Sequence, residues 1–319
     1  MTNAIIPAEA HEVQTQNFVQ AGLVERFIRF AGVSPKSAQT YKTCVNQLNK
    51  YFATNNIQLP TREDLEVWRD GLIDAGKSPA TVQLYLTSAK IFFRWLAQEG
   101  IYKNIADNLK ARVRISHEHK KDALTTDQAA TLIKTVSGDS LKNLRDRAIV
   151  SLMVCSALRC VEVTRLDVAD MLNQFGRTYL LIQGKGYSSK SAKVLLPRQC
   201  ENLIRDYLTA RGNVEAGQPL FTSTANRNRG SRLSPQTVSK LVKAHLRAAG
   251  FDSPRLTAHS LRHTALTQMI FQGVDLVAVQ MVARHTSVAI TQRYLHTVER
   301  MRNTAEQQVA DAFFNSISA

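Results

Sequence analysis

A succession of amphipathic helical segments in the first hundred residues constrains the fold most. In "NFVQAGLVERFIRFA", Phe18, Leu23, Phe27 and Phe30 recur at helical spacing. The next three segments, up to Gly100, begin with Ser-Pro or with a Thr cap, which are typical helix starts. Residues 17–102 are therefore expected to form a four-helix domain that follows a flexible N-terminus at residues 1–16.

The chain then changes character twice. Residues 103–123 are polar, basic and poor in apolar periodicity, which suits an interdomain linker crossing nucleic acid or equally a plain solvated loop. From Leu124 the pattern is mostly helical, interrupted by the β-type runs "TYLLIQG" and "AKVLLP" on either side of a polar turn. The expected fold is mainly α, with a second, mixed α/β domain at 124–319 that is mostly helical and has a small antiparallel sheet.

The charge of the chain points to a polyanionic partner. It carries 41 basic and 26 acidic residues, a net charge of +15, and a folded protein this basic usually binds nucleic acid, although basic residues also serve solubility. No stretch approaches the roughly 20 apolar residues of a membrane span. The four cysteines show no C-x-x-C spacing. We therefore expect a cytoplasmic, nucleoid-associated protein with reduced cysteines and no membrane partner.

The stretch "AHSLRHTALTQM" places His259, Arg262 and His263 within one turn of an expected helix. Two histidines four residues apart could bind zinc, but Ser260 stands where a zinc hydrolase needs glutamate, and Arg262 would repel the metal. The three side chains fall on one face, and a guanidinium flanked by imidazoles suits an anion such as phosphate. A core histidine beside a surface arginine remains the plain alternative.

Further cationic or nucleophilic side chains sit at similar positions between elements. Arg159 lies where one apolar helix ends and another begins, and Lys185 is flanked by glycines in the expected hairpin turn. His285 and Tyr294 follow in "RHTSVAITQRY". Taken alone, Tyr294 would be read as an amphipathic surface tyrosine.

These motifs, in this order, resemble the tyrosine recombinase (phage-integrase) family: "SALRCVEV", "GKG", "HSLRH" and "RHTSVAITQRY". The resemblance covers nearly the whole chain, since a four-helix, SAM-like core-binding domain before the catalytic domain is also the plan of the family. It implies a site-specific DNA recombinase of compact, Xer- or Cre-like size without an arm-binding domain.

The resemblance also implies a role for each motif residue. Tyr294 would be the nucleophile that forms a 3′-phosphotyrosine bond, and Arg159 and Arg262 would clamp the phosphate. Lys185 would be the general acid for the leaving 5′-oxygen. His259 would be a base or a phosphate contact, and His285 would donate a hydrogen bond to the phosphate. Because the phosphotyrosine bond conserves the energy of the phosphodiester, neither ATP nor a metal is implied.

Three residues near these positions have secondary implied roles. Glu162 matches an acidic residue that orients Arg159, and His263 would support the site by packing. The family usually has Leu-Gly-His where this chain has "VARH", so Arg284 replaces a glycine that allows a tight turn between helices. We expect this turn to be adjusted, and Arg284 could add a phosphate contact.

Partners follow from the resemblance and from the distribution of charge. The expected partner is double-stranded DNA with paired sites, bound by a homotetramer that is a monomer or weak dimer when free. A C-terminal helix at about 298–317 carries an apolar stripe, which would dock on a neighbouring subunit or pack on its own domain. Candidate DNA contacts, each also compatible with a solvated surface, are Lys36, Lys42, Lys77, Lys90, Arg227 and Arg229.

Other functions share the same residue types. A type IB topoisomerase would nick and reseal DNA with these side chains but would act as a monomer. A DNA-binding accessory protein would lack the chemistry, against which the apparently complete set of motif residues argues. A recombinase in a mobile element or replicon, acting in integration, excision or resolution, is the favoured prediction.

Overall fold

The computed structural model describes residues 22–112, 122–184 and 187–317, so the expected flexible residues 1–16 and the central part of the expected linker lie outside the described residues. The chain divides into two compact units, residues 1–116 and 117–319. Among the described residues, no helix combines the length and the apolar character that crossing a membrane requires.

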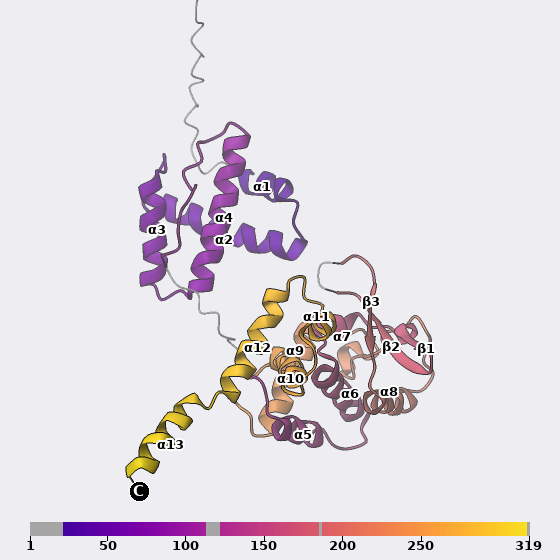
Figure 1. The fold of residues 1–319 in the computed structure, drawn as a ribbon. Helices are drawn as coiled ribbons and strands as arrows, with labels where there is room; N and C mark the ends of the chain where they lie inside the picture. Colours follow the sequence, from indigo (N-terminus) through magenta and orange to yellow (C-terminus); the bar gives the residue numbers. More distant parts are fainter. Residues whose placement is uncertain (1–21, 113–121, 185–186, 318–319) are drawn as a thin grey trace, which may run out of the picture. The chain divides into compact units, whose positions relative to one another are not determined.

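The N-terminal unit is built from four helices, labelled in Figure 1: α1 (Leu23–Ala31), α2 (Pro35–Thr54), α3 (Arg62–Asp74) and α4 (Pro79–Gln98). The side chains of the expected cap residues accept hydrogen bonds from backbone amides in the first turns of α2, α3 and α4. Large aromatic side chains fill the centre, where the Phe27 and Phe92 rings meet edge to face at 5.2 Å. The four-helix prediction is confirmed.

The first part of the expected linker packs on this unit. Ile105, Ala106 and Leu109 are buried in the same apolar cluster as the four helices. The sequence did not show this, because three apolar residues in an irregular segment make no helical or strand period. The N-terminal unit therefore extends beyond residue 102.

The C-terminal unit begins with α5 (Thr126–Thr135), α6 (Leu141–Ser156) and α7 (Cys160–Arg165). After η1 (Val168–Asp170) the strands β1 (Met171–Gln174), β2 (Arg177–Ile182) and β3 (Ala192–Leu195) form an antiparallel sheet in that order. The mainly α fold with a small antiparallel sheet is confirmed. Strand β1 was not expected, because its four residues alternate too weakly to stand out; it pairs with β2 across the left-handed residues Phe175 and Gly176.

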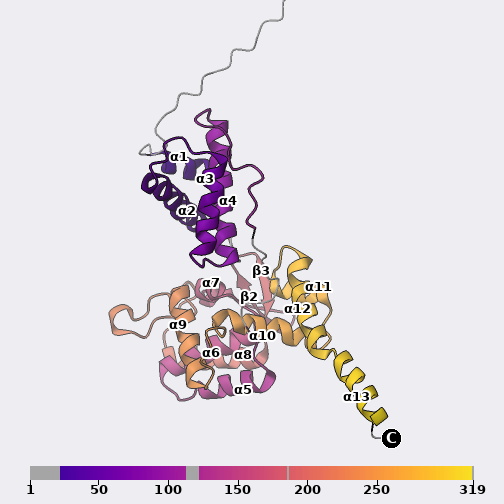
Figure 2. The same ribbon diagram turned by 90° about the vertical axis from the view of Figure 1, so that its left-hand side faces the viewer.

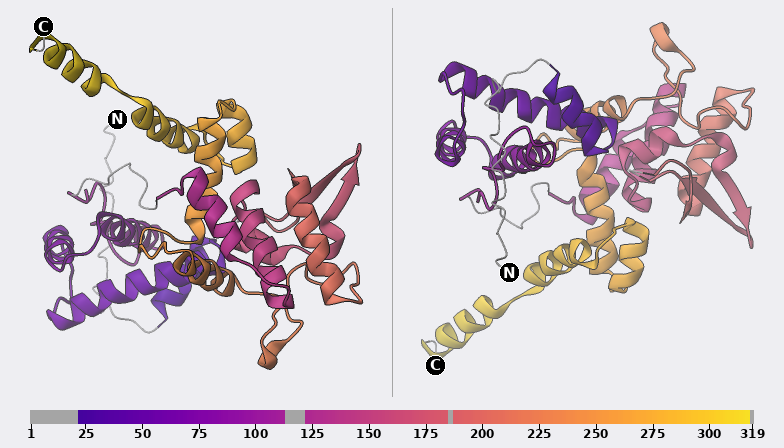
Figure 3. Two further views of the ribbon diagram at one scale, coloured as in Figure 1. Left: turned by 90° about the horizontal axis from the view of Figure 1, so that it is seen from below. Right: turned by 90° about the horizontal axis from the view of Figure 1, so that it is seen from above.

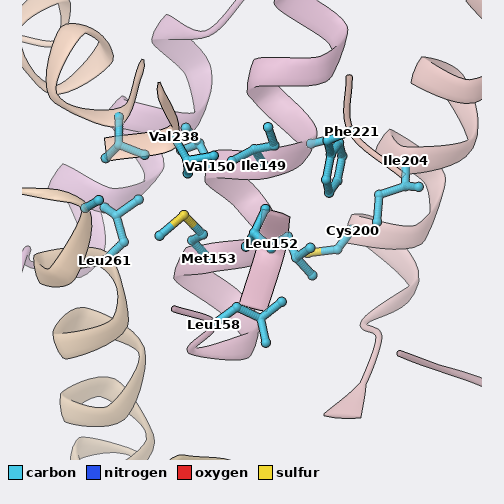
Figure 4. Packing of buried hydrophobic residues seen from close by; sticks show 14 of the residues in the cluster. Ile149, Val150, Leu152, Met153, Leu158, Cys200, Ile204, Phe221, Val238 and Leu261 are labelled. Carbon is cyan, nitrogen blue, oxygen red and sulfur yellow. The ribbon is translucent and has the colours of Figure 1, made fainter. Parts of the chain in front are cut away.

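Helices make up the rest of this unit: α8 (Arg198–Arg211), α9 (Pro235–Ala248), α10 (Ala258–Phe271), α11 (Leu276–Ala283), α12 (Val288–Arg302) and α13 (Ala305–Ile317), with η2 (Asn226–Asn228) before α9. Helix α6 lies at the centre of the main core. Figure 4 shows Ile149, Val150, Leu152 and Met153 of α6 between the side chains of α9 and α10 on one side and those of α8 on the other.

A second, smaller apolar cluster joins α10, α11 and α12. It contains Leu266 and Ile270 of α10, Val279 of α11, and Tyr294 and Val298 of α12. Helix α10 is thus buried nearly all round, with His259 exposed near its start. His259, Arg262 and His263 differ in burial, with the first exposed and the other two buried, because α10 packs on α6, α9, α11 and α12 at once.

The C-terminal segment differs from the single helix expected at about 298–317. Helix α12 ends at Arg302, and Asn303 takes an extended conformation. The Asn303 side chain then accepts a hydrogen bond from the Ala305 amide at 2.9 Å, which starts α13. Figures 2 and 3 show α13 extending from α12 away from the rest of the C-terminal unit.

Candidate active site

Four segments distant in sequence meet around Arg262. The first is the junction of α6 and α7, which carries Ala157, Arg159 and Glu162. The other three are the first turns of α10, the end of α11 and the middle of α12. In Figure 1 the helices α10, α11 and α12 lie together in the C-terminal unit. The junction at α6 and α7 is sharp because Ala157 adopts a left-handed conformation, with φ 52°.

Arg262 is held between the C-terminal ends of two helices. Its guanidinium donates to the backbone carbonyl of Ala157, which follows α6, and to that of Ala283, the last residue of α11. Both carbonyls belong to helix ends, where the helix dipole is negative. The side chain is 1% exposed, and burial, together with the positive charges of Arg159 and Arg284, lowers the pKa of Arg262 to about 9.

Arg159 occupies the N-cap of α7 and is paired with a buried carboxylate. Its backbone amide and its guanidinium each donate to Glu162 at 2.8 Å. Glu162 is 0% exposed, and its burial would raise its pKa, but Arg284 and Arg159 hold that pKa below the ordinary value. The prediction that Glu162 orients Arg159 agrees with this geometry.

His285 lies between Arg262 and Thr291. The Arg262 guanidinium is 3.2 Å from Nε2 of His285, and the Thr291 hydroxyl is 2.9 Å from Nδ1. A guanidinium only donates, so Nε2 accepts and Nδ1 carries the proton. Burial and the surrounding arginines lower the pKa of His285 to about 4, so the ring is neutral at pH 7.

Tyr294 is enclosed by two histidine rings. The His263 ring meets it edge to face at 4.9 Å, and the His285 ring is stacked on it at 6.0 Å. Tyr294 is 3% exposed. Burial raises the pKa of the phenol, while Arg262 and Arg159 oppose that rise. The phenol therefore lies in the field of both arginines, but burial outweighs that field and the pKa of Tyr294 stays above its ordinary value, which disfavours phenolate.

The two histidines of the "HSLRH" motif take different positions. His263 is buried, with Nδ1 3.0 Å from the Thr267 hydroxyl, and it packs against Tyr294 as a supporting residue. His259 is exposed on the first turn of α10 and lies close enough to help disfavour the protonated form of His285. Among the described residues, no cluster of three or more His, Cys, Asp or Glu could hold a metal ion.

A cavity of about 410 Å³ opens beside these residues. Arg159, Arg284, His285 and Thr286 line one part of it, and residues from both flanks of the β2–β3 turn, including Gly184 and Tyr187, line another. Lys185 lies outside the described residues. On the described parts of this turn, Arg165 donates to the Gly184 carbonyl at 3.1 Å and Lys190 pairs with Asp167 at 2.6 Å.

The turn at Arg284 is not adjusted as expected. Arg284 itself adopts the left-handed conformation at the C-cap of α11, with φ 54°, where glycine is the usual residue. Its guanidinium donates to Glu162 at 2.8 Å and to the Ala157 carbonyl at 3.2 Å. The motif comparison identified Arg284 as unusual but did not predict these partners.

The residues proposed for DNA contact differ in exposure. Arg227 and Arg229 are exposed on the loop around η2, which stands away from the helices of its unit in Figure 2. In the N-terminal unit, Lys36 and Lys77 are exposed and Lys90 is partly buried. Lys42 is paired with Glu25 at 3.0 Å, which makes it less available than the sequence indicated.

Sequence reasoning missed two partners in the site. Thr291, which is fully buried, bonds to Nδ1 of His285, and the Ala157 carbonyl accepts from two arginines. Thr291 lies three residues before Tyr294, one turn back on α12. That spacing places both side chains on one face of the helix and could have predicted that Thr291 lies near the site. A backbone carbonyl carries no signal in the sequence at all.

Comparison with known proteins identifies the family of the chain. The phage integrase family matches residues 122–300, and the phage integrase N-terminal SAM-like domain matches residues 24–100. The tyrosine recombinase XerC of Pelobacter propionicus is 31% identical over 270 residues, which cover 83% of this chain and 85% of that protein.

Two solved structures share the fold. One is the XerH site-specific recombinase, bound to a palindromic difH substrate in a post-cleavage complex. Its TM-score is 0.71 at 20% sequence identity, and the alignment covers 91% of this chain and 84% of the XerH chain. A lambda integrase tetramer bound to a Holliday junction has a TM-score of 0.64 at 17% identity, covering 86% and 76%. The chain belongs to the phage integrase family of tyrosine recombinases, and it is a site-specific recombinase that cleaves and rejoins DNA through a tyrosine.

Proposed function

We propose that Tyr294 is the nucleophile and that Arg159 and Arg262 bind the scissile phosphate. The observation that carries this assignment is the position of the phenol, whose ring stacks on His285, the residue that contacts the Arg262 guanidinium. Free tyrosine has a pKa of about 10, so forming phenolate at pH 7 costs about 4 kcal/mol. Two fixed cations reduce this cost and stabilise the charge that develops on the phosphorus oxygens.

The proposed step is a transesterification. The Tyr294 oxygen attacks phosphorus, a bond to the 3′-phosphate forms, and the bond to the 5′-oxygen breaks. The leaving oxygen takes a proton, which we assign to Lys185 from the sequence motif. The reverse reaction, with a 5′-hydroxyl from a second strand, rejoins the DNA. Since one phosphoester replaces another, the reaction as proposed uses neither ATP nor a metal.

The histidines contribute around this step. We assign His285 as a phosphate contact through Nε2, which at present accepts from Arg262 and would become a donor if the ring changed tautomer or gained a proton. His259, exposed at the start of α10, is the candidate base or phosphate contact. Because Tyr294 is buried, we expect DNA binding to open its hydroxyl to the phosphate.

We propose that the substrate is double-stranded DNA with paired sites, bound by a homotetramer. Helix α13 supports the tetramer, since Val309, Phe313 and Ile317 on it are exposed, the last two at 66% and 78%. Such a stripe suits docking on another subunit. The lambda integrase to which this chain is similar was solved as a tetramer on a Holliday junction.

Binding of DNA would use the basic surface outside the site. The net charge of +15, and the exposed side chains of Lys36, Lys77, Arg227 and Arg229, support contacts to backbone phosphates. We propose integration, excision or resolution of a DNA element as the process, in the cytoplasm at the nucleoid. The free cysteines among the described residues are compatible with a reducing compartment.

The test uses a nicked suicide substrate built from the DNA that flanks the element, in EDTA, with the wild type, Tyr294→Phe and Tyr187→Phe. Tyr187 is the matched control, an exposed tyrosine that lines the cavity. We expect a 3′-linked covalent adduct in the wild type and in Tyr187→Phe, and none in Tyr294→Phe. An adduct that persists in Tyr294→Phe would contradict the assignment. Crossed-strand products from two sites would separate a recombinase from a topoisomerase.

A further inference from the structure

Arg284 occupies a backbone conformation that disfavours it. Its φ of 54° and ψ of 45° lie in the left-handed region, which costs an L-residue other than glycine roughly 1–2 kcal/mol. Glycine avoids this cost, and it is the usual choice at a helix C-terminus. An arginine at this position therefore needs compensation from its side chain.

The side chain makes contacts that only a guanidinium can make together. It donates to both carboxylate oxygens of Glu162, at 2.8 and 3.3 Å, and to the carbonyls of Ala157 at 3.2 Å and Val282 at 2.6 Å. It is 12% exposed. Arg284 thus ties the end of α11 to the junction of α6 and α7.

Both of these distant acceptors are shared with the phosphate-binding arginines. Glu162 also accepts from Arg159, and the Ala157 carbonyl also accepts from Arg262. Arg284 makes no hydrogen bond to either arginine, since guanidinium groups only donate, but it shares one acceptor with each of them. Its influence on the phosphate site therefore passes through Glu162 and Ala157.

The charges show what this sharing does. Glu162 is fully buried and carries one negative charge. If Arg159 were the one cationic partner of Glu162, the pair would be neutral. Both carboxylate oxygens of Glu162 would then be available to the Arg159 guanidinium. With Arg284 on the other side, the group of three carries a net charge of +1. A buried charge near the phosphate acts strongly because water screens it little.

We propose that Arg284 is a positioning residue for DNA cleavage, which takes one side of Glu162 so that Arg159 keeps an uncompensated positive charge towards the scissile phosphate. This role rests on the proposed function of Tyr294 and the two arginines. It goes beyond that function by assigning a third guanidinium, on a left-handed residue at a helix C-terminus where glycine is usual, to the electrostatics of the site.

The experiment is a cycle of Arg284→Gly and Glu162→Gln, measured as the single-turnover rate of adduct formation on saturating suicide substrate. Glycine removes the guanidinium and relieves the left-handed backbone. We expect Arg284→Gly to slow the reaction roughly ten-fold when Glu162 is present, as expected for coupled neighbours. In the Glu162→Gln background, where no negative charge needs sharing, Arg284→Gly should change the rate less than about three-fold.

Two controls separate this role from a general structural one. Arg112 has the same left-handed backbone, with φ 54°, and lies in the N-terminal unit with an exposed side chain, so Arg112→Gly should cleave at the wild-type rate. A substrate with a neutral methylphosphonate at the scissile position needs less positive charge. On the methylphosphonate substrate, the rate difference between Arg284→Gly and the wild type should therefore become smaller. A variant that had only lost packing would show the same rate difference on both substrates.

If Arg284→Gly fails to fold, the role of the charge can be tested by comparing Arg284→Lys with Arg284→Ala. Arg284→Lys keeps the positive charge and should cleave faster than Arg284→Ala. A wild-type rate in Arg284→Gly, or an equal defect in both Glu162 backgrounds, would overturn the proposal. Failure of the proposed function would look different, since the wild type would form no adduct, or Tyr294→Phe would still form one, and this role would then be overturned with it.

Discussion

The His263 ring meets the Tyr294 ring edge to face, with centroids 4.9 Å apart, where α10 packs on α12. His263 is fixed in turn by Thr267, one turn further along α10. The tyrosine is therefore supported from behind by a buried residue of the same helix that carries Arg262. The spacing between Tyr294 and Arg262 depends on one helix pair rather than on a loop.

This support predicts the result of truncating His263. His263→Ala should leave a cavity beneath Tyr294, lower the free energy of unfolding by about 2 kcal/mol and slow adduct formation. His263→Phe, which keeps a ring, should retain more of the free energy of unfolding and more of the rate of adduct formation than His263→Ala. Thermal unfolding and single-turnover cleavage would measure the two effects. Equal behaviour of His263→Ala and the wild type would contradict the packing role.

Arg262 should not tolerate lysine. Its guanidinium spans the carbonyls of Ala157 and Ala283 while lying beside His285, and one ammonium group cannot reach all three in that geometry. Arg262→Lys should lower cleavage by about 100-fold, the effect of losing one or two donors to a developing charge. The adduct assay checks this, with Arg293→Lys, on an exposed position of α12, as the matched control. Near wild-type cleavage in Arg262→Lys would mean that the fork geometry is dispensable.

The stability of the DNA-free protein should depend on His285 at mildly acidic pH. Its pKa is lowered to about 4 in the folded protein, whereas an unfolded histidine titrates near 6.5. Between these values the unfolded chain binds the extra proton, so the free energy of unfolding falls as the pH decreases from about 6.5 to about 4. Denaturant unfolding at several pH values measures the slope.

His285→Asn should flatten that slope, because no titrating ring remains. His296→Asn is the control, since His296 is an exposed histidine on α12, and this variant should keep the wild-type slope. If His285→Asn and the wild type lost stability in parallel, another group would be responsible for the acid sensitivity.

Removal of α13 should separate folding from assembly. Its apolar side chains Val309, Phe313 and Ile317 are exposed, so a chain that ends at Asn303 should unfold at nearly the wild-type temperature. It should still form an adduct on a single half-site, but tetramers on paired sites should be lost. Analytical ultracentrifugation with DNA measures the latter. Unchanged tetramers would show that α13 is not the docking element.

Helix positions could be predicted from the sequence because local chemistry sets them. Ser34, Thr61, Ser78 and Ser234 all cap helices as their sequence context indicated. The same reasoning missed β1, whose four residues gain their order from pairing with β2. It also missed the packing of Ile105 and Leu109, which depends on a surface formed by distant helices.

The motifs identified the candidate residues of the site, but they did not predict the burial of these residues or the contacts between them. No pattern in the sequence shows that His259 is exposed while Arg262 and His263 are buried, because α10 meets four other helices. The partners of Arg284 were out of reach for a similar reason, since Glu162 lies more than a hundred residues earlier in the chain. These relations arise from tertiary packing, which overrides the preference of any single segment.

The hydrogen bond from Arg262 to the Ala157 carbonyl joins positions 105 residues apart, and the nucleophile lies later still. An emerging chain therefore contains Arg159 and Arg262 before it contains Tyr294, and the phenol is positioned only when α12 has docked on α10. A nascent or truncated polypeptide can bind DNA through its basic surface but has no means of breaking it. The order of the residues along the chain makes the ability to cut DNA the last property that the protein acquires during synthesis.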